Sequence, residues 1–396
     1  MKKNGTLNIE NSCLVCQCHT LHLVSKGTEW LPAVSSDNKP WNAKIPIYVC
    51  KTCGHIQKAI NQQWQEDAAA IYAEYDLYKL REGAEHVVVE SENQVSRSGL
   101  ILDHVEHEIT LPSQGKLLDF GCGNGSVFRT FGPRHPAWSL IGFDANARYR
   151  EEVIRLPGVQ AFFCGKLDQL EPSFDLMTAY YVMEHVIRPV DVLEHLHHIL
   201  NASGILCLVV PNVWENAFDL MVADHCSHFF PASLSSLLTR CGYDVFRIAT
   251  HWVQRSIVVL CRKRRPNQQP LSHIIPDIET IRQRVERRLK WLEELALQAL
   301  QLSDSQTFGI LGTATAGSWL AGVVGDNVNF FVDEDPGCIG KTHLGRPIIA
   351  PSEVSDDAVV YLSLPPQLAT DIRTRLVSKF PGKRFIVPAI FSMEGF

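Results

Sequence analysis

The sequence predicts an α/β protein with two units built on parallel sheets, preceded by a small metal-binding module. Between residues 116 and 262, short apolar runs alternate with helical segments, a pattern typical of a doubly wound sheet with helices on both faces. A second alternation of this kind begins at Thr307. Two pairs of cysteines precede both units, in a stretch with little hydrophobic periodicity.

Length and composition indicate a globular chain of several domains. Its 396 residues exceed the size at which single cores stop growing, and 45% hydrophobic with 20% charged residues is ordinary globular composition. A net charge of −6 argues against a nucleic-acid backbone as partner. The polar amino terminus predicts no signal peptide, and no stretch approaches the roughly 18 apolar residues of a membrane helix. We therefore expect a cytoplasmic protein with no membrane partner.

The apolar runs and helical patterns divide the chain into five expected parts. These are a zinc-binding module (1–64), a helical bridge (65–114), a central sheet domain (115–265), a linker with a long amphipathic helix (266–306) and a smaller Rossmann-like α/β domain (307–396). The expected central strands are 116–120, 138–144, 159–163, 174–180, 204–210 and 256–260. The expected carboxyl-terminal strands are 308–312, 328–333, 358–364 and 384–390.

A glycine-rich turn follows the first central strand. The run LLDFGCGNGSVF ends its strand at Asp119 and continues through Gly121 and Gly123, which allow backbone to approach a ligand closely. The next strand ends in Asp144, a carboxylate that can accept both hydroxyls of a ribose. A glycine-rich turn alone is weak evidence, and the spacing here differs from the G-x-G-x-x-G of dinucleotide enzymes.

The segments that follow in order strengthen this interpretation. With FFCGKLDQL and FDLMTAYYVMEHV after the turn, about 150 residues resemble the class I S-adenosylmethionine-dependent methyltransferases. The resemblance implies that Asp119 orients the methionine end of the cofactor, that the two glycines line its backbone, and that Asp144 holds the ribose. It further implies as cofactor-site residues Ala145, Gly165, Lys166, Leu167, Tyr180 and His185, with 165–167 near adenine and Tyr180 by the sulfonium. Glu184 and His185 also fit a helix cap with a packing role.

Two C-x2-C pairs, Cys13 with Cys16 and Cys50 with Cys53, are separated by 33 residues. Two such knuckles complete a tetrahedral thiolate site for a structural Zn²⁺. Cys18, His19 and His55 are possible substitute ligands, and redox or incidental thiols are the alternative. All four positions of such a site would be filled by protein, so the metal would not be catalytic.

Over nearly the whole chain, the order of parts resembles the zinc-containing sugar C-methyltransferases that act on nucleotide-linked deoxyketosugars. The resemblance rests on the cysteine knuckles, the tyrosine-rich IYAEYDLY, the methyltransferase unit and the final FGILGTATAGSWL with FFVDEDPG. The resemblance implies a nucleotide-linked sugar as acceptor, part of which the last domain could hold near Asp333. That domain could instead only complete the wall of the active site.

Carbon methylation beside a ketone needs a base, and the family carries Tyr-His-Glu-His for it. Here the run is Val222-Ala223-Asp224-His225, so the final histidine is present, aspartate replaces glutamate and the tyrosine is absent. We expect His225, oriented by Asp224, to be the base. Other residues considered for catalysis are His228, Tyr181 and His185. The departure leaves open methylation of oxygen or nitrogen, a structural turn at Asp224 and His225, a nucleic-acid methyltransferase, and a non-catalytic binding protein. Neither the acceptor nor the oligomeric state follows from the sequence.

Overall fold

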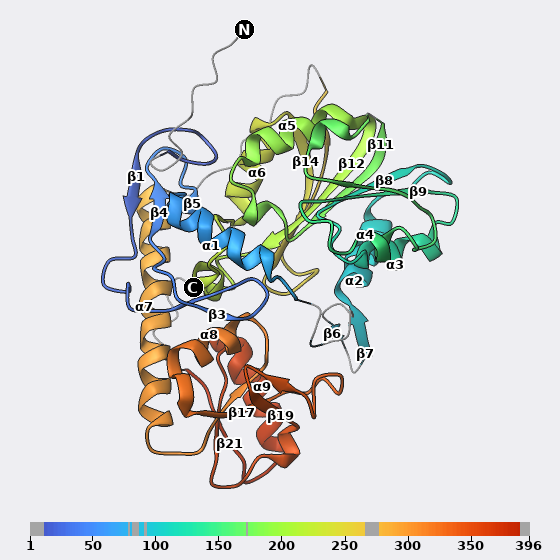
Figure 1. The fold of residues 1–396 in the computed structure, drawn as a ribbon. Coiled ribbons are helices and arrows are strands. Elements are labelled where there is room, and N and C mark those ends of the chain that lie inside the picture. The colour runs from blue at the N-terminus through green and yellow to red at the C-terminus, as the bar shows by residue number, and fades with distance from the viewer. Residues whose placement is uncertain are drawn as a thin grey trace.

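A computed structural model describes residues 12–77, 80, 87–90, 93–171, 173–265 and 277–388. Figure 1 shows the central sheet with its helices beside the blue amino-terminal segment, and the orange and red carboxyl-terminal unit below both. The mixed α/β fold with Rossmann-like parallel sheets is confirmed. The boundaries of the five parts stay predictions.

The central unit is a seven-stranded sheet in the order β10-β9-β8-β11-β12-β15-β14. The first five of these strands are parallel, and β15 runs antiparallel to both of its neighbours. The order reverses between β8 and β11, so a crevice for ligands is expected at the carboxyl ends of these strands. The strands are β8 (Lys116–Phe120), β9 (Ser139–Asp144), β10 (Val159–Cys164), β11 (Phe174–Tyr180), β12 (Leu200–Pro211), β14 (Tyr243–Ala249) and β15 (Ser256–Lys263).

Six of these strands coincide with the apolar runs of the sequence, whereas β14 was not predicted. Its sequence, YDVFRIA, mixes charged and apolar residues, and Phe246 and Arg247 are exposed. The helices of this unit are α2 (Arg97–Glu108), α3 (Ser126–Arg134), α4 (Arg150–Val153), α5 (Pro189–Ile199) and α6 (Pro231–Arg240).

The amino-terminal module is more regular than the sequence indicated. An antiparallel sheet in the order β1-β4-β5-β13 is formed by β1 (Leu21–Leu23), β4 (Ile47–Cys50), β5 (Ile56–Lys58) and β13 (Ser227–His228). A second pair consists of β2 (Ala33–Val34) and β3 (Pro40–Trp41). Because β13 belongs to the central part of the chain, the sheet of this module includes one strand from the segment that follows β12.

The helical bridge was only partly predicted. Helix α1 (Gln62–Ala73) is capped by Asn61, whose side chain accepts from the Trp64 amide. A hairpin of β6 (Val87–Glu90) and β7 (Asn93–Ser96) then interrupts the expected helical pattern before α2. The valines at 87–89 explain the difference, since β-branched residues favour strands.

The carboxyl-terminal unit is a six-stranded sheet in the order β18-β19-β17-β16-β20-β21. Its strands are β16 (Phe308–Leu311), β17 (Val328–Val332), β18 (Thr342–His343), β19 (Arg346–Ile349), β20 (Val359–Tyr361) and β21 (Arg384–Ile386), and its helices are α8 (Thr315–Val324) and α9 (Pro366–Lys379). All pairs are parallel except β18 with β19. The proline-rich linker at 266–270 lies outside the described residues, and β18 and β19 were not predicted.

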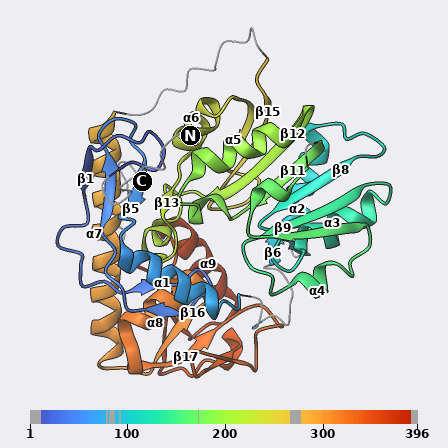
Figure 2. The ribbon, with the colours of Figure 1, turned by 45° about the horizontal axis from the view of Figure 1, so that its top comes forward.

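One long helix joins the three units. Helix α7 (Ile278–Ser303) runs along one side of the molecule past the module and down to the carboxyl-terminal sheet (Figures 1 and 2). Its Arg288 is 1% exposed and donates to the carbonyl oxygens of Val213 and Trp214, just after β12. This buried contact fixes the helix against the loop that follows the last parallel strand. No helix in the described part of the chain combines the length and hydropathy needed to cross a membrane.

We predict that Gly317→Ala destabilises the carboxyl-terminal unit. A Cβ on Gly317 would lie 2.0 Å from the carbonyl oxygen of Gly312, so the backbone of α8 or of the preceding turn must move. The expected cost is about 1–3 kcal/mol, typical of overpacking, read as a lower urea midpoint. The control is Thr374→Ala on an exposed position of α9, with almost no change expected. An unchanged midpoint for Gly317→Ala would contradict the tight packing.

Candidate functional site

The turn after β8 forms one wall of the crevice. Asp119 is 2% exposed and accepts a hydrogen bond from Thr178 Oγ1 at 2.6 Å, which joins the ends of β8 and β11. Gly121 has φ +81°, and a Cβ there would lie 2.2 Å from a methyl carbon of Val182. Only glycine fits this backbone beside Val182.

Asp144 lies directly opposite that turn. Its carboxylate accepts from the Gly123 amide at 2.9 Å and from the Asn146 amide at 2.9 Å. Burial raises the pKa of Asp144 above its ordinary value. Cys164, at the end of β10, pairs in register with Asp144, so the 165–167 turn lies beside it. Cys164 Sγ also donates to the carbonyl oxygen of Ala145 at 3.5 Å.

These positions gather most of the residues that the sequence assigned to the cofactor. The carboxylate of Asp144, the turn at 121–123 and the turn at 165–167 surround the carboxyl ends of three adjacent strands. No side chain within 4 Å would meet a Cβ on Gly165, which leaves open space there. The arrangement suits an adenosine, because the Asp144 carboxylate has acceptor sites for ribose hydroxyls besides those used by the two amides.

Tyr180, the last residue of β11, and Tyr181, which follows it, differ in their surroundings. Tyr180 is half-buried and accepts a weak hydrogen bond from Cys207 Sγ at 3.7 Å. Tyr181 adopts φ +57°, and its hydroxyl lies 2.8 Å from Ser256 Oγ under the guanidinium of Arg97. The contacts described for Tyr181 therefore hold it against β15 rather than against the histidines discussed next.

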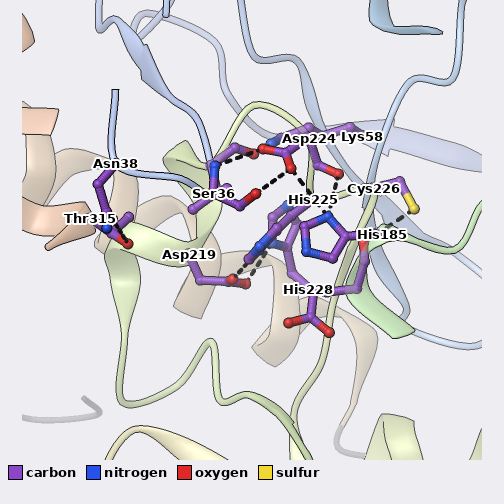
Figure 3. Close-up of polar contacts among 12 residues, drawn as sticks. Ser36, Asn38, Lys58, His185, Asp219, Asp224, His225, Cys226, His228 and Thr315 are labelled. Atoms are coloured by element: carbon purple, nitrogen blue, oxygen red, sulfur yellow. Dashed lines mark hydrogen bonds and ion pairs between the residues drawn. The ribbon is translucent and has the colours of Figure 1, made fainter. Parts of the chain in front are cut away.

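Two histidines share one buried carboxylate. Asp219, in the short helix η5 (Ala217–Met221), lies 2.7 Å from His225 Nδ1 through one oxygen and 2.7 Å from His228 Nδ1 through the other (Figure 3). All three side chains are at least nine-tenths buried. Burial alone would raise the pKa of Asp219, but His228 and His225 lower it below its ordinary value. Burial lowers the pKa of His225 to about 4 despite Asp219.

Asp224 does not orient His225 as the sequence suggested. Its carboxylate accepts from the amide and hydroxyl of Ser36 and lies 3.3 Å from His185 Nδ1. Asp224 lies in a turn in which the His225 amide donates to the carbonyl oxygen of Val222 at 3.3 Å, and Asp224 and His225 take different partners there. Burial lowers the pKa of His185, but the contact with Asp224 outweighs it and raises that pKa.

The two aspartate–histidine pairs meet edge to face. The rings of His185 and His225 have centroids 4.6 Å apart at 90°. His185, expected at the cofactor, lies in this cluster, on the single turn η4 (Met183–His185). Glu184 beside it is 1% exposed, its carboxyl oxygens have no partner among the described residues, and burial raises its pKa to about 8.

Glu184, His185 and His225 offer donor atoms within 4.8 Å of one another. Imidazole nitrogens with a carboxylate are a donor set for several divalent metals. His225 can therefore serve either as a base or as a metal ligand.

The amino-terminal module closes over this cluster. Trp64 Nε1 on α1 donates to the carbonyl oxygen of Ala223 at 2.8 Å, and His55 Nε2 lies 3.1 Å from Ser227 Oγ. The ring of Tyr72 lies edge-on to His185 with centroids 6.0 Å apart. Lys58, 2% exposed, donates through Nζ to the carbonyl oxygen of Val222. The catalytic candidates are thus held by contacts from both units.

The four knuckle cysteines converge at the far end of the same module. Their Sγ atoms lie within 4.8 Å of one another, with Cys13 and Cys53 at 3.5 Å and Cys16 and Cys50 at 3.5 Å. All twelve cysteines of the chain are free. Amides of Thr52 and Cys53 point at Cys50 Sγ, as in thiolate knuckles. This donor set fits a tetrahedral zinc ion. Cys18 lies nearby, 3.3 Å from Cys50 through sulfur, but outside the group of four.

Sequence reasoning missed Asp219, Ser36 and Lys58. Asp219 stands six residues before His225 in a stretch read only as a loop, and its bidentate role depends on the turn between them. Ser36 and Lys58 reach the cluster from 188 and 164 residues away in the chain. No local pattern could have indicated either contact.

Residues 97–248 match the family model described as a methyltransferase domain. A search of the curated proteins found no match. Similar solved structures include a TehB-like S-adenosylmethionine-dependent methyltransferase from Corynebacterium glutamicum, 19% identical over 51% of this chain and 95% of that chain with a TM-score of 0.33. An S-adenosylmethionine-dependent methyltransferase from Mesorhizobium loti is 16% identical over 41% of this chain and 98% of that chain, with a TM-score of 0.35. N,N-8-amino-8-demethyl-D-riboflavin dimethyltransferase from Streptomyces davawensis is 20% identical over 38% of this chain and 49% of that chain, with a TM-score of 0.34.

We predict that Asp144→Ala weakens binding of S-adenosylmethionine. Loss of a charged acceptor for the ribose hydroxyls should cost about 1.5–3 kcal/mol, or roughly 10- to 150-fold in Kd. Isothermal titration calorimetry measures this directly. Glu151→Ala, which removes a carboxylate that is 84% exposed on α4, is the control and should bind as the wild type does. Equal affinity of Asp144→Ala and wild type would refute the ribose assignment.

Proposed function

We propose that this S-adenosylmethionine-dependent methyltransferase of the class I fold methylates a carbon atom of a small molecule, a nucleotide-linked ketosugar or a related biosynthetic intermediate. Two observations support methyl transfer as the reaction: residues 97–248 match the methyltransferase-domain model, and the central sheet has the strand order described above. The observation that carries the proposed chemistry is the buried Asp219–His225 pair beyond the carboxyl end of β12.

Bound S-adenosylmethionine supplies an electrophilic methyl group on a sulfonium. In the proposed complex, Asp119 and the 121–123 turn hold its methionine end, while Asp144 accepts from the ribose hydroxyls. Both carboxylates end neighbouring strands of the sheet, which fixes them on a rigid frame.

His225 is the proposed base. Asp219 holds its Nδ1, which leaves Nε2 as the nitrogen that accepts a proton. Because its pKa is lowered to about 4 by burial, the ring is unprotonated at neutral pH. His225 takes the proton from the carbon beside the acceptor's carbonyl, and that carbon's electron pair forms the new bond to the methyl carbon as the sulfur–methyl bond breaks. The proton then passes from His225 to solvent.

A base with so low a pKa is a weak one, so the developing enolate needs stabilisation. His185 is suited to this because its pKa is raised by Asp224 and its ring contacts that of His225. An imidazolium there would place positive charge beside the acceptor's oxygen. His185 would thus serve in place of the tyrosine of the Tyr-His-Glu-His run, because residue 222 of this chain is valine.

The carboxyl-terminal unit supports a nucleotide-linked acceptor. The turn from Gly312 to Thr315 opens α8, and Thr313 Oγ1 donates to Asp333 at 3.2 Å at the ends of β16 and β17. Thr315 Oγ1 lies 3.1 Å from Asn38 Oδ1, two residues from the Ser36 that holds Asp224 (Figure 3). An acceptor whose sugar lies at His225 and whose nucleotide lies at this turn would extend across the short loop that carries Ser36 and Asn38.

The acceptor class is tested with purified protein, S-adenosylmethionine and three probes: a nucleotide-linked deoxyketosugar, a simple phenol and a transfer RNA. Mass spectrometry of the products reports the methylated molecule, and exchange of solvent deuterium into the unreacted ketosugar beside its carbonyl reports proton removal at carbon. Methylation of the phenol or the RNA alone would contradict the proposal, and methylation of an oxygen would move it to the alternative O-methyltransferase.

We predict that His225→Gln lowers turnover by at least about 100-fold with almost unchanged cofactor affinity, since only proton transfer is lost. Turnover is measured with the acceptor identified above and affinity by calorimetry. The matched control is His198→Gln on an exposed position of α5, expected to be fully active. A stable His225→Gln protein that turns over normally would exclude His225 as base and direct attention to His228 or His185.

We further propose that Cys13, Cys16, Cys50 and Cys53 hold one structural zinc ion. Such a site can supply on the order of 10 kcal/mol to a segment with a small core. In this protein the segment carries Ser36, Lys58 and Trp64, so its order determines the geometry around Asp224 and His225.

We predict one zinc per chain, lost in Cys50→Ala but retained in the control Cys164→Ala. Elemental analysis gives the stoichiometry, and hydrogen exchange over residues 12–64 should increase only in the first variant. Fresh wild-type protein without zinc would refute the assignment. Two equivalents, with one lost in Glu184→Ala, would instead indicate a cation at His185 and His225 and would remove His225 from the role of base.

A further inference from the structure

A buried carboxyl group lies beside the two aspartate–histidine pairs and takes no part in the chemistry proposed above. Glu184 is 1% exposed, and neither of its carboxyl oxygens has a hydrogen-bond partner among the described residues. Its backbone is held in place, because its carbonyl oxygen accepts from the Cys226 amide at 2.8 Å. A buried carboxylate is costly unless it is paired or binds a metal. The surroundings of this side chain therefore lack a cation.

Both neighbouring imidazoles are held through the same ring nitrogen. An Asp219 oxygen lies 2.7 Å from His225 Nδ1, and an Asp224 oxygen lies 3.3 Å from His185 Nδ1. An ionised carboxylate only accepts hydrogen bonds, so each ring, when neutral, carries its proton at Nδ1 and its lone pair at Nε2. Carboxylates placed in this way fix the tautomer and orientation of histidines that bind a metal through the other nitrogen.

The donor groups of three residues converge. One donor atom each of Glu184, His185 and His225 lies within 4.8 Å of the others, and the two rings meet at 90° with centroids 4.6 Å apart (Figure 3). Ligands of a tetrahedral ion with bonds of about 2.0–2.1 Å lie about 3.3 Å apart, so these donors need to close by about 1.5 Å at most. The described residues form no hydrogen bond with the Glu184 carboxyl that would oppose this movement.

A second group in the same cluster is less suited to a metal. Asp219, His225 and His228 also have donor atoms within 4.8 Å of one another. Both oxygens of Asp219 already hold imidazole nitrogens, each at 2.7 Å, so this carboxylate serves as an outer partner of the rings. Both oxygens of Glu184 are available, and the His185 side chain, 16% exposed, gives that group its contact with solvent.

We propose that Glu184, His185 and His225 form a second metal site, which takes one divalent transition-metal cation such as Zn²⁺ or Co²⁺. Two imidazoles with one carboxylate suit these ions better than Mg²⁺, which prefers oxygen ligands. Three protein ligands leave a coordination position open to water or to another molecule. The site thereby differs from that of the cysteine module, where thiolates would fill all four positions.

A metal at this site excludes the proposed use of His225. A nitrogen lone pair that binds a metal cannot also take a proton from the acceptor, so metal and proton compete for the same atom. The metal site rests on the contacts above and not on the proposed function, whereas its effect on turnover rests on His225 being the base. An added cation should therefore inhibit methyl transfer.

The test is a titration of full-length protein that already holds zinc at its cysteines. Calorimetry with added Co²⁺ should show one further equivalent, and its absorption spectrum should lack the sulfur-to-cobalt charge-transfer band of a thiolate site. Mg²⁺ at the same concentrations should not bind. Glu184→Met and His225→Gln, which each remove a ligand, should weaken Co²⁺ binding by more than the roughly 10- to 100-fold typical of an outer partner, and Asp219→Asn by about that amount.

Glu194→Met and His198→Gln, on exposed positions of α5, are the matched controls and should bind Co²⁺ as the wild type does. Absence of a further equivalent in the wild type would overturn the proposal. Undiminished binding in folded Glu184→Met, with or without loss in His228→Gln, would overturn it as well. Circular dichroism reports folding, and if Glu184→Met does not fold, His225→Gln decides by the same criterion.

Turnover separates this site from the proposed function. With an active acceptor, the further Co²⁺ should abolish turnover, and a chelator too weak to take zinc from the cysteines should restore it. Full turnover with the further Co²⁺ bound would contradict the base role of His225 and leave the metal site intact. No further equivalent in the wild type, together with lost turnover in His225→Gln, would overturn the metal site and leave the base role intact.

Discussion

The pairing of β5 with β13 is the constraint on which the rest of the site depends. Two register pairs, Ser227 with Gln57 and His228 with Ile56, join the cysteine module to the loop beyond β12. Because these residues adjoin His225 on one strand and Lys58 on the other, the backbone hydrogen bonds of one small sheet fix both the catalytic candidates and the groups that hold them. The module is therefore part of the site and not an appendage to it.

Electrostatics inside this joint follow from burial. Water is excluded from Asp219 and Asp224, so each carboxylate must be compensated by specific partners rather than by solvent. Asp219 uses two imidazoles, and Asp224 uses Ser36 and His185. Burial lowers the pKa of His225 despite Asp219, whereas Asp224 raises the pKa of His185, so the two neighbouring rings differ in their tendency to hold a proton.

Regular, strongly apolar elements were predictable and long-range contacts were not. β8 and β9 were found in the sequence because each is a buried run that ends in a carboxylate at the ligand edge. The module was read as irregular because its strands have two to four residues, too few to show a period. Adjacency in the sequence misled for Asp224 and His225, because the turn that carries them leaves Asp224 with Ser36 and His185 as partners. The partner of His225 lies six residues earlier, on a different turn.

The pairing of β5 with β13 also bears on how the chain reaches its final state. During synthesis β5 emerges about 170 residues before its partner β13, so until then β5 has an unpaired edge. Contacts so distant in sequence form slowly, and an open strand edge invites pairing with other chains in the meantime. A metal bound early by the knuckles would hold the short strands in register during that interval. The concentration of available metal during synthesis would then determine what fraction of the protein folds instead of aggregating.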